Sequence, residues 1–197
     1  MTDFHCLICR QVKQLLLAAS LIVLPIFAAS AGATEKPVQS AVGRSSFSKA
    51  MLEGHNAERA KLKLAALRWN VQLAADAKAW AEQLAASNSF EHAHDEVQTK
   101  NQGENLWMGT ADAFRYPEML DFWLGERTHA KSGRFPDVSK TGNWMDVAHY
   151  TQIVWPTTKQ VGCALAKNAS DEFLVCRYFP AGNIDGESLR IARRKQA

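Results

Sequence analysis

Four separate stretches of the chain carry histidine or glutamate side chains that could bind a metal ion or transfer a proton. The candidate residues are His92, Glu104, Glu126 and His149. Imidazole and carboxylate groups are zinc ligands, and both can act as acids or bases near neutral pH. Each residue also has an ordinary interpretation. A single histidine in a strand is usually a hydrogen-bonded core or surface group, and a glutamate at a helix end is usually solvated. Periodicity alone does not bring the four residues together.

Three helices are expected to support these residues. The first begins at residue 45 or 46, where serine is a good N-cap, and ends near residue 62. The second spans residues 71–87, with Asn70 as its cap and an apolar stripe that faces the core. The third spans residues 113–127 and carries Glu126 near its end.

Two polar, glycine-containing stretches, at residues 88–112 and 129–146, are expected to be irregular loops. Two long loops in one compact domain usually serve a function rather than a mere connection. The last third of the chain is rich in β-branched and aromatic residues and predicts three strands, at residues 149–155, 160–167 and 172–179. Residues 168–171 have the composition of a hairpin turn between the last two strands.

Two cysteines lie in this predicted hairpin. Cys163 and Cys176 fall on neighbouring strands, which a hairpin places side by side, as disulfide geometry requires. We therefore predict a disulfide between them, and two buried free thiols are the alternative. Cys6 and Cys9 form a CxxC pair near the N-terminus, but no second pair is present to complete a zinc site.

The first 33 residues have the order of a secretory signal peptide. Arg10 and Lys13 precede an apolar run at residues 15–29, and small residues follow. The run is short for a membrane span, which needs about 20 residues, and it contains Pro25. An uncleaved N-terminal anchor is the alternative. Cleavage would leave a mature chain without a transmembrane span, secreted or periplasmic.

The rest of the chain predicts one globular domain. We expect a flexible leader at residues 34–45, a domain at 46–186 and a basic tail at 187–197. Hydrophobic residues make up 47% of the chain and charged residues 22%, as in an ordinary globular protein. The net charge is only +3 and no stripe of Lys and Arg runs through the domain, so we expect no nucleic-acid partner.

Several ordered motifs give the chain a resemblance to a known family. They are His149-Tyr150-Thr151-Gln152-Ile153-Val154-Trp155, Gly103-Glu104-Asn105-Leu106, Trp123-x-x-Glu126, the segment from Phe173 to Ile184, His55-Asn56, and Leu67-Arg68-Trp69-Asn70. From about residue 47 to residue 184 the chain resembles the CAP superfamily, which covers cysteine-rich secretory proteins, antigen 5 and pathogenesis-related 1 proteins.

The resemblance implies an α+β fold, a three-layer α-β-α sandwich, with the four candidate residues meeting in one cleft. His92 stands where the family has its first cleft histidine, although His94 could take that place. Cys163 and Cys176 match the family's strand-to-strand disulfide. Ala148 stands where the family commonly has glycine, so the backbone there must tolerate negative φ.

Three functions are compatible with such a cleft. The first is binding, either of Zn²⁺ or another divalent cation through His92 and His149, or of a lipid, a sterol or another protein. The second is metal-dependent hydrolysis with Glu104 or Glu126 as base. No Ser or Cys nucleophile accompanies the four residues in the motifs, so we favour a protein that is not an enzyme. The third is a hydrogen-bonded network that fixes the two loops and binds no ligand.

Overall fold

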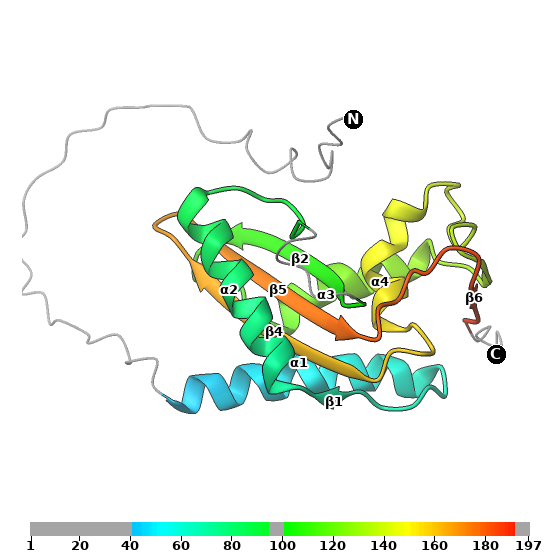
Figure 1. Ribbon diagram of the computed structural model, residues 1–197, viewed down its shortest axis with the longest axis horizontal. Coiled ribbons are helices and arrows are strands. Elements are labelled where there is room, and N and C mark those ends of the chain that lie inside the picture. The colour runs from blue at the N-terminus through cyan, green and yellow to red at the C-terminus, as the bar shows by residue number, and fades with distance from the viewer. Residues whose placement is uncertain (1–40, 95–100, 192–197) are drawn as a thin grey trace, which may run out of the picture. The chain divides into compact units, whose positions relative to one another are not determined.

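The computed structural model describes residues 41–94 and 101–191 (Figure 1). The predicted signal peptide and leader residues 34–40 lie outside the described residues, and their limits stay predictions. None of the described helices is long and apolar enough to cross a membrane.

A four-stranded sheet forms the centre of the domain, in the order β1-β4-β5-β2 (Figure 1). Its strands are β1 (Arg68–Trp69), β2 (Gly103–Thr110), β4 (Gln160–Lys167) and β5 (Asp171–Phe179). β1 runs parallel to β4, and the other two pairings are antiparallel. The hairpin of β4 and β5 is confirmed. In its turn, the Asn168 side-chain oxygen accepts hydrogen bonds from the amides of Ser170 and Asp171, 3.0 and 2.8 Å away.

Cys163 and Cys176 face each other directly across β4 and β5 and form the predicted disulfide, with their Cα atoms 4.0 Å apart. The bond ties together the two central strands. Because its two ends are neighbours in the sheet, it closes the hairpin without changing the register of the strands.

The helices form the two outer layers. They are α1 (Ala41–Lys61), α2 (Val71–Ser87), α3 (Tyr116–Gly125) and α4 (Ala148–Ile153), with short 3-10 helices η2 (Glu126–Thr128) and η3 (Trp144–Val147). The bounds of α2 are as predicted, and the Asn70 side chain caps it by accepting from the amides of Gln72 and Leu73. α1 begins earlier than expected. The third predicted helix is shorter, and Glu126 falls in the 3-10 turn that follows it.

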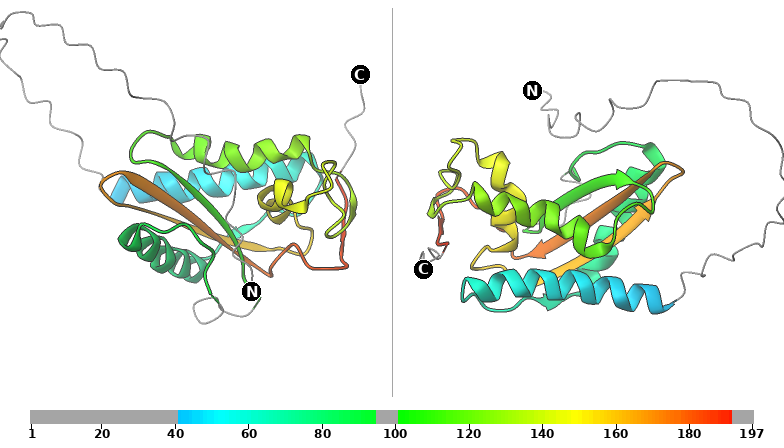
Figure 2. Two further views of the ribbon diagram at one scale, coloured as in Figure 1. Left: turned by 90° about the horizontal axis from the view of Figure 1, so that it is seen from above. Right: turned by 180° about the vertical axis from the view of Figure 1, so that it is seen from behind.

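The two faces of the sheet bury different sets of side chains. On one face α2 packs Trp80 and Leu84 against Phe173 and Val175 of β5. On the other, α1, α3 and α4 pack Met51, Trp123 and Tyr150 against the intervening residues of the same strands, such as Leu174 and Tyr178. Figure 2 (left) shows the sheet between α2 and the pair α1 and α3. The α+β class and the three-layer α-β-α sandwich are therefore confirmed.

The prediction of a strand at residues 149–155 is wrong, because most of this segment forms α4. Every residue from Tyr150 to Trp155 is buried, so the segment lacks the one-sided apolar pattern that identifies a surface helix. Its β-branched and aromatic residues then favour a strand on composition alone. In the helix, the Thr151 hydroxyl donates to the backbone oxygen of Val147, 3.0 Å away.

The prediction that residues 88–112 are irregular is wrong for β2. This strand pairs with β5 along its whole length, from Gly103 opposite Tyr178 to Thr110 opposite Asp171. Glycine, asparagine and glutamate are poor strand formers, so the pairing partner rather than local preference sets this conformation.

The second long loop also contains regular structure. β3 (Gly133–Arg134) pairs with β6 (Ser188–Leu189), and Leu189 is buried. The amide of Ile191 donates to the Ser132 hydroxyl, 2.8 Å away. Ordered contacts thus continue beyond residue 186, where we expected the domain to end.

Candidate functional site

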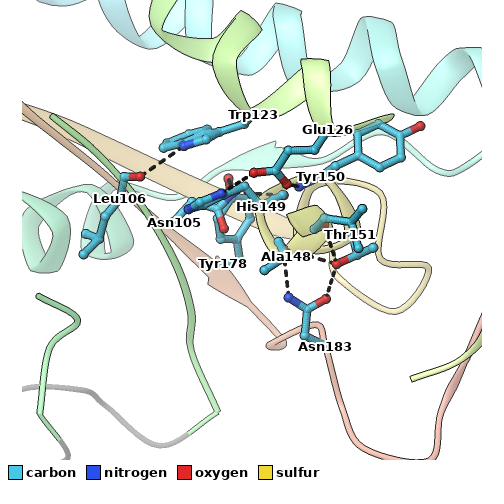
Figure 3. Close-up of polar contacts among 11 residues, drawn as sticks. Asn105, Leu106, Trp123, Glu126, Ala148, His149, Tyr150, Thr151, Tyr178 and Asn183 are labelled. Atoms are coloured by element: carbon cyan, nitrogen blue, oxygen red, sulfur yellow. Dashed lines mark hydrogen bonds and ion pairs between the residues drawn. The ribbon is translucent and has the colours of Figure 1, made fainter. Parts of the chain in front are cut away.

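His149 and Glu126 form a direct pair between α4 and η2 (Figure 3). His149 Nδ1 lies 2.5 Å from Glu126 Oε1, and the other carboxylate oxygen accepts from the amide of Tyr150 at 2.9 Å. The indole of Trp123, from the preceding helix, stacks on the imidazole with ring centroids 5.8 Å apart and planes inclined by 13°. The carboxylate and the indole together fix both the tilt and the rotation of the ring.

Two asparagines hold α4 in place for this pair (Figure 3). Asn105 on β2 donates to the backbone oxygen of His149 and to the Tyr178 hydroxyl, each 3.1 Å away. Asn183 donates to the backbone oxygen of Ala148 at 2.9 Å and accepts from the Thr151 hydroxyl at 2.7 Å. These residues all lie in or next to the sequence motifs, but the motifs alone did not indicate a role for Asn105, Tyr178 or Asn183.

His92 and Glu104 form a second pair at the start of β2. His92 Nδ1 lies 2.7 Å from Glu104 Oε1, which also accepts from the amide of Ala93 at 3.1 Å. The imidazole is 66% exposed, whereas the carboxylate is only 2% exposed. His94, the competing residue, lies 3.9 Å from Glu91 and has its ring next to Trp80. Of the two histidines, His92 is the one that contacts Glu104.

Arg177 on β5 is the counter-ion of Glu104. Its Nη2 lies 2.8 Å from Glu104 Oε2, and both side chains are buried. The two atoms are not aligned for a hydrogen bond, and Nε and Nη1 have no hydrogen-bond partner in the described part of the chain. Burial lowers the pKa of Arg177, and the charges of Glu104 and Asp76 oppose that shift. Sequence reasoning missed this residue, although an arginine in a strand of otherwise buried residues was a visible signal.

The two pairs are held from opposite faces of β2, which is an edge strand of the sheet. Glu104 and Asn105 are consecutive on β2, so their side chains point to opposite faces. Glu104 shares its face with Arg177 and α2, whereas Asn105 contacts α4 on the other. Within the described ranges, no group of three or more His, Cys, Asp or Glu side chains is placed to hold a metal ion. The contacts join the four candidates as two His–Glu pairs, and their meeting in one cleft stays a prediction.

Each imidazole is nevertheless oriented as metal-binding histidines are. A carboxylate accepts but does not donate, so the Nδ1 atoms of His92 and His149 carry the protons. In the neutral rings, Nε2 then keeps its lone pair. Metal-bound histidines commonly donate their other N–H to a carboxylate in this way. The residues present therefore fit a divalent cation that approaches the Nε2 atoms.

Comparison with family models agrees with this fold. Residues 52–178 match the model described as "CAP: Cysteine-rich secretory protein family". The chain belongs to this family.

Plant proteins are among the named relatives of the chain. The chain is 33% identical over 138 residues to pathogenesis-related protein 1C of Nicotiana tabacum, which covers 70% of this chain and 77% of the relative. Pathogenesis-related protein 1B of the same plant is 32% identical over the same length.

Among solved structures, NaASP2 superposes with a TM-score of 0.60 at 23% identity, covering 78% of this chain and 87% of that chain. Venom allergen-like protein 4 of Schistosoma mansoni gives a TM-score of 0.55 at 23% identity, covering 76% and 96%. These similarities show the fold.

Proposed function

We propose that this protein is an exported binding protein that holds a divalent cation, with Zn²⁺ as the best fit, through Nε2 of His92 and His149. The observation that carries the proposal is the pair of Nδ1–carboxylate contacts, 2.7 Å at His92 and 2.5 Å at His149. In both contacts the protonated nitrogen, Nδ1, binds the carboxylate, and the unprotonated nitrogen, Nε2, stays available to a metal ion.

Two protein ligands would hold the cation reversibly. Zinc is usually four-coordinate, so water or a ligand from solution would complete the site. Glu104 and Glu126 would orient the imidazoles rather than bind the metal. A structure of NaASP2, a protein of the same fold, was solved with Zn²⁺, which supports the choice of metal.

The contacts of Glu104 disfavour the hydrolase alternative. One of its carboxylate oxygens accepts from His92 and Ala93, and the other faces Arg177. With both oxygens engaged in this way, the carboxylate has no free oxygen to take a proton from a metal-bound water. Glu126 is likewise occupied on both oxygens, by His149 and by the amide of Tyr150.

Lipid or sterol binding also stays a prediction. Among the described residues, one open surface hollow is lined by Ala113, Phe114, Glu118, Asp121 and Phe122. Two acidic side chains in so shallow a hollow do not favour a wholly apolar ligand.

Zinc titration of the purified protein tests the proposal. With free Zn²⁺ at about 100 times its Kd, binding to the folded state stabilises it by about 2.7 kcal/mol, which raises the Tm. We expect His92→Ala and His149→Ala each to abolish most of that rise. His129→Ala, which removes another exposed histidine, should keep it. A wild-type Tm that zinc does not change would refute the proposal and favour the ligand-free network.

Export is a separate part of the proposal, supported by the signal-like order of the first 33 residues. Intact mass of the protein recovered from the periplasm or the medium of an expressing bacterial host tests it. We expect a mass that lacks these residues. Full-length protein confined to the cytoplasm would contradict export without bearing on zinc.

A further inference from the structure

Glu58 on α1 is a buried carboxylate that contacts the residues next to His149 and Glu126 in the chain. Its side chain is only 1% exposed. Its Oε1 accepts from the Tyr150 hydroxyl at 3.2 Å, and its Oε2 faces Arg127 Nη1 at 3.0 Å and Lys61 Nζ at 2.7 Å. One buried carboxylate thus binds groups from α1, η2 and α4.

Two of these three partners of Glu58 are direct neighbours of the pair in the chain. Arg127 follows Glu126, and Tyr150 follows His149. The amide of Tyr150 also donates to Glu126. Because Glu58 fixes the residue after each member of the pair, it constrains the distance between η2 and α4 that the contact of His149 with Glu126 needs.

The surroundings of Glu58 keep Glu58 and Tyr150 in the protonation states that the hydrogen bond between them needs. Burial alone would raise the pKa of Glu58, but the hydrogen bonds and charges of Lys61 and Arg127 outweigh it and lower that pKa. Burial, followed by the charge of Glu58 and the hydrogen bond to it, raises the pKa of Tyr150. At neutral pH Glu58 is therefore an ionised acceptor and Tyr150 a protonated donor.

We propose that Glu58 is a positioning residue for the His149–Glu126 pair, and that it sets the orientation of His149 Nε2 and hence the affinity of this half of the site for a divalent cation. The His92–Glu104 pair has no contact with Glu58 among the described residues. Glu58 therefore acts on one pair and not on the other. The part of this inference that concerns affinity rests on the proposed zinc site.

Two variants test the role of Glu58. Glu58→Gln keeps the shape and removes the charge, and Tyr150→Phe removes only the hydroxyl through which α4 contacts Glu58. Glu53→Gln is the matched control, because it makes the same change on the same helix at a side chain that is 66% exposed. The readouts are the ¹⁵N and ¹H signals of the two imidazole rings, which report tautomer and hydrogen bonding, and the Kd for Zn²⁺.

We expect both variants to shift the ring signals of His149 and leave those of His92 unchanged. Zinc affinity should weaken about tenfold, the lower end of what losing a ligand's own hydrogen-bond partner costs. Glu53→Gln should match the wild type in both readouts.

A Glu58→Gln protein with lower stability but wild-type His149 signals would overturn the inference, because Glu58 would then be only structural. If wild-type protein binds no zinc, the proposed function fails, but the ring signals still decide whether Glu58 positions His149.

Discussion

The two His–Glu pairs use the same chemical groups in different surroundings. Glu104 is 2% exposed and faces Arg177, which is fully buried. Glu126 is 18% exposed, and its side chain contacts the imidazole of His149 rather than a guanidinium or an ammonium group. His92 is largely exposed, whereas His149 is 29% exposed and stacks on Trp123.

This difference indicates that the His92–Glu104 pair contributes mainly to folding and the His149–Glu126 pair mainly to ligand binding. At the His92–Glu104 pair, the carboxylate is the counter-ion of the buried Arg177, and the histidine contacts this carboxylate from the surface. At the second pair the carboxylate serves mainly the histidine, and neutral hydrogen bonds from Asn105 and Asn183 hold the helix behind it. Loss of Glu104 should therefore cost mostly stability, and loss of Glu126 mostly ligand affinity.

The largest expected effect tests the first half of this contrast. Glu104→Gln leaves the buried guanidinium of Arg177 without its counter-ion, so we expect the free energy of unfolding to fall by about 3–5 kcal/mol in urea denaturation. Glu82→Gln on α2 removes an exposed, paired carboxylate and is the control, with an expected change within about 0.5 kcal/mol. If Glu104→Gln lowers the free energy of unfolding no more than Glu126→Gln does, the two pairs do not differ in this way.

The next largest effect concerns the support of the second pair. His55 is fully buried, where its Nδ1 donates to the Met51 oxygen and its Nε2 accepts from the Tyr178 hydroxyl. Tyr178 in turn accepts from Asn105, which also holds the backbone oxygen of His149. Burial, with a smaller contribution from the charge of Arg59, lowers the pKa of His55 from 6.5 to about 4.

Stability should therefore fall as the pH falls from 6.5 towards 4, because the unfolded chain takes up a proton that the folded protein refuses. The shift corresponds to about 3 kcal/mol of unfolding free energy. Comparison of urea denaturation of wild type and His55→Gln across this range isolates the effect, since the variant lacks the titrating group. Parallel pH profiles for the two proteins would show that His55 is not held neutral.

The smallest stability effect tests the second half of the contrast. Glu126→Gln keeps the shape and should cost about 1–2 kcal/mol of unfolding free energy, because a partly exposed hydrogen-bonded charge is replaced by an amide. The same variant should weaken zinc binding by about tenfold or more, as measured by calorimetric titration. Unchanged zinc affinity would mean that Glu126 does not orient His149.

The sequence predicted the elements whose signals are local. α2 has a clear apolar stripe and an asparagine cap, and the β4–β5 hairpin has two largely apolar strands around an asparagine-led turn. α4 and β2 were misassigned because their conformations depend on surroundings that no short window contains. α4 is buried from Tyr150 to Ile153, and β2 consists of residues that become a strand only beside β5.

The residues of the site also divide into those that sequence motifs predict and those whose roles depend on the folded structure. The four candidate residues came from motif resemblance, and the structure pairs each histidine with a glutamate. Arg177 and Glu58 were missed because their roles depend on partners far away in the chain. The distances that matter, from Arg177 to Glu104 and from Glu58 to Tyr150, exist only after the sheet and the helices have packed.

The most direct test of the account follows the imidazole nitrogens of ¹⁵N-labelled protein by NMR during a zinc titration. We predict that the Nε2 resonances of both His92 and His149 shift as zinc is added, while their Nδ1 atoms stay protonated and bound to the carboxylates. Zinc that shifts neither Nε2 resonance, or that displaces the Nδ1 protons instead, would contradict it.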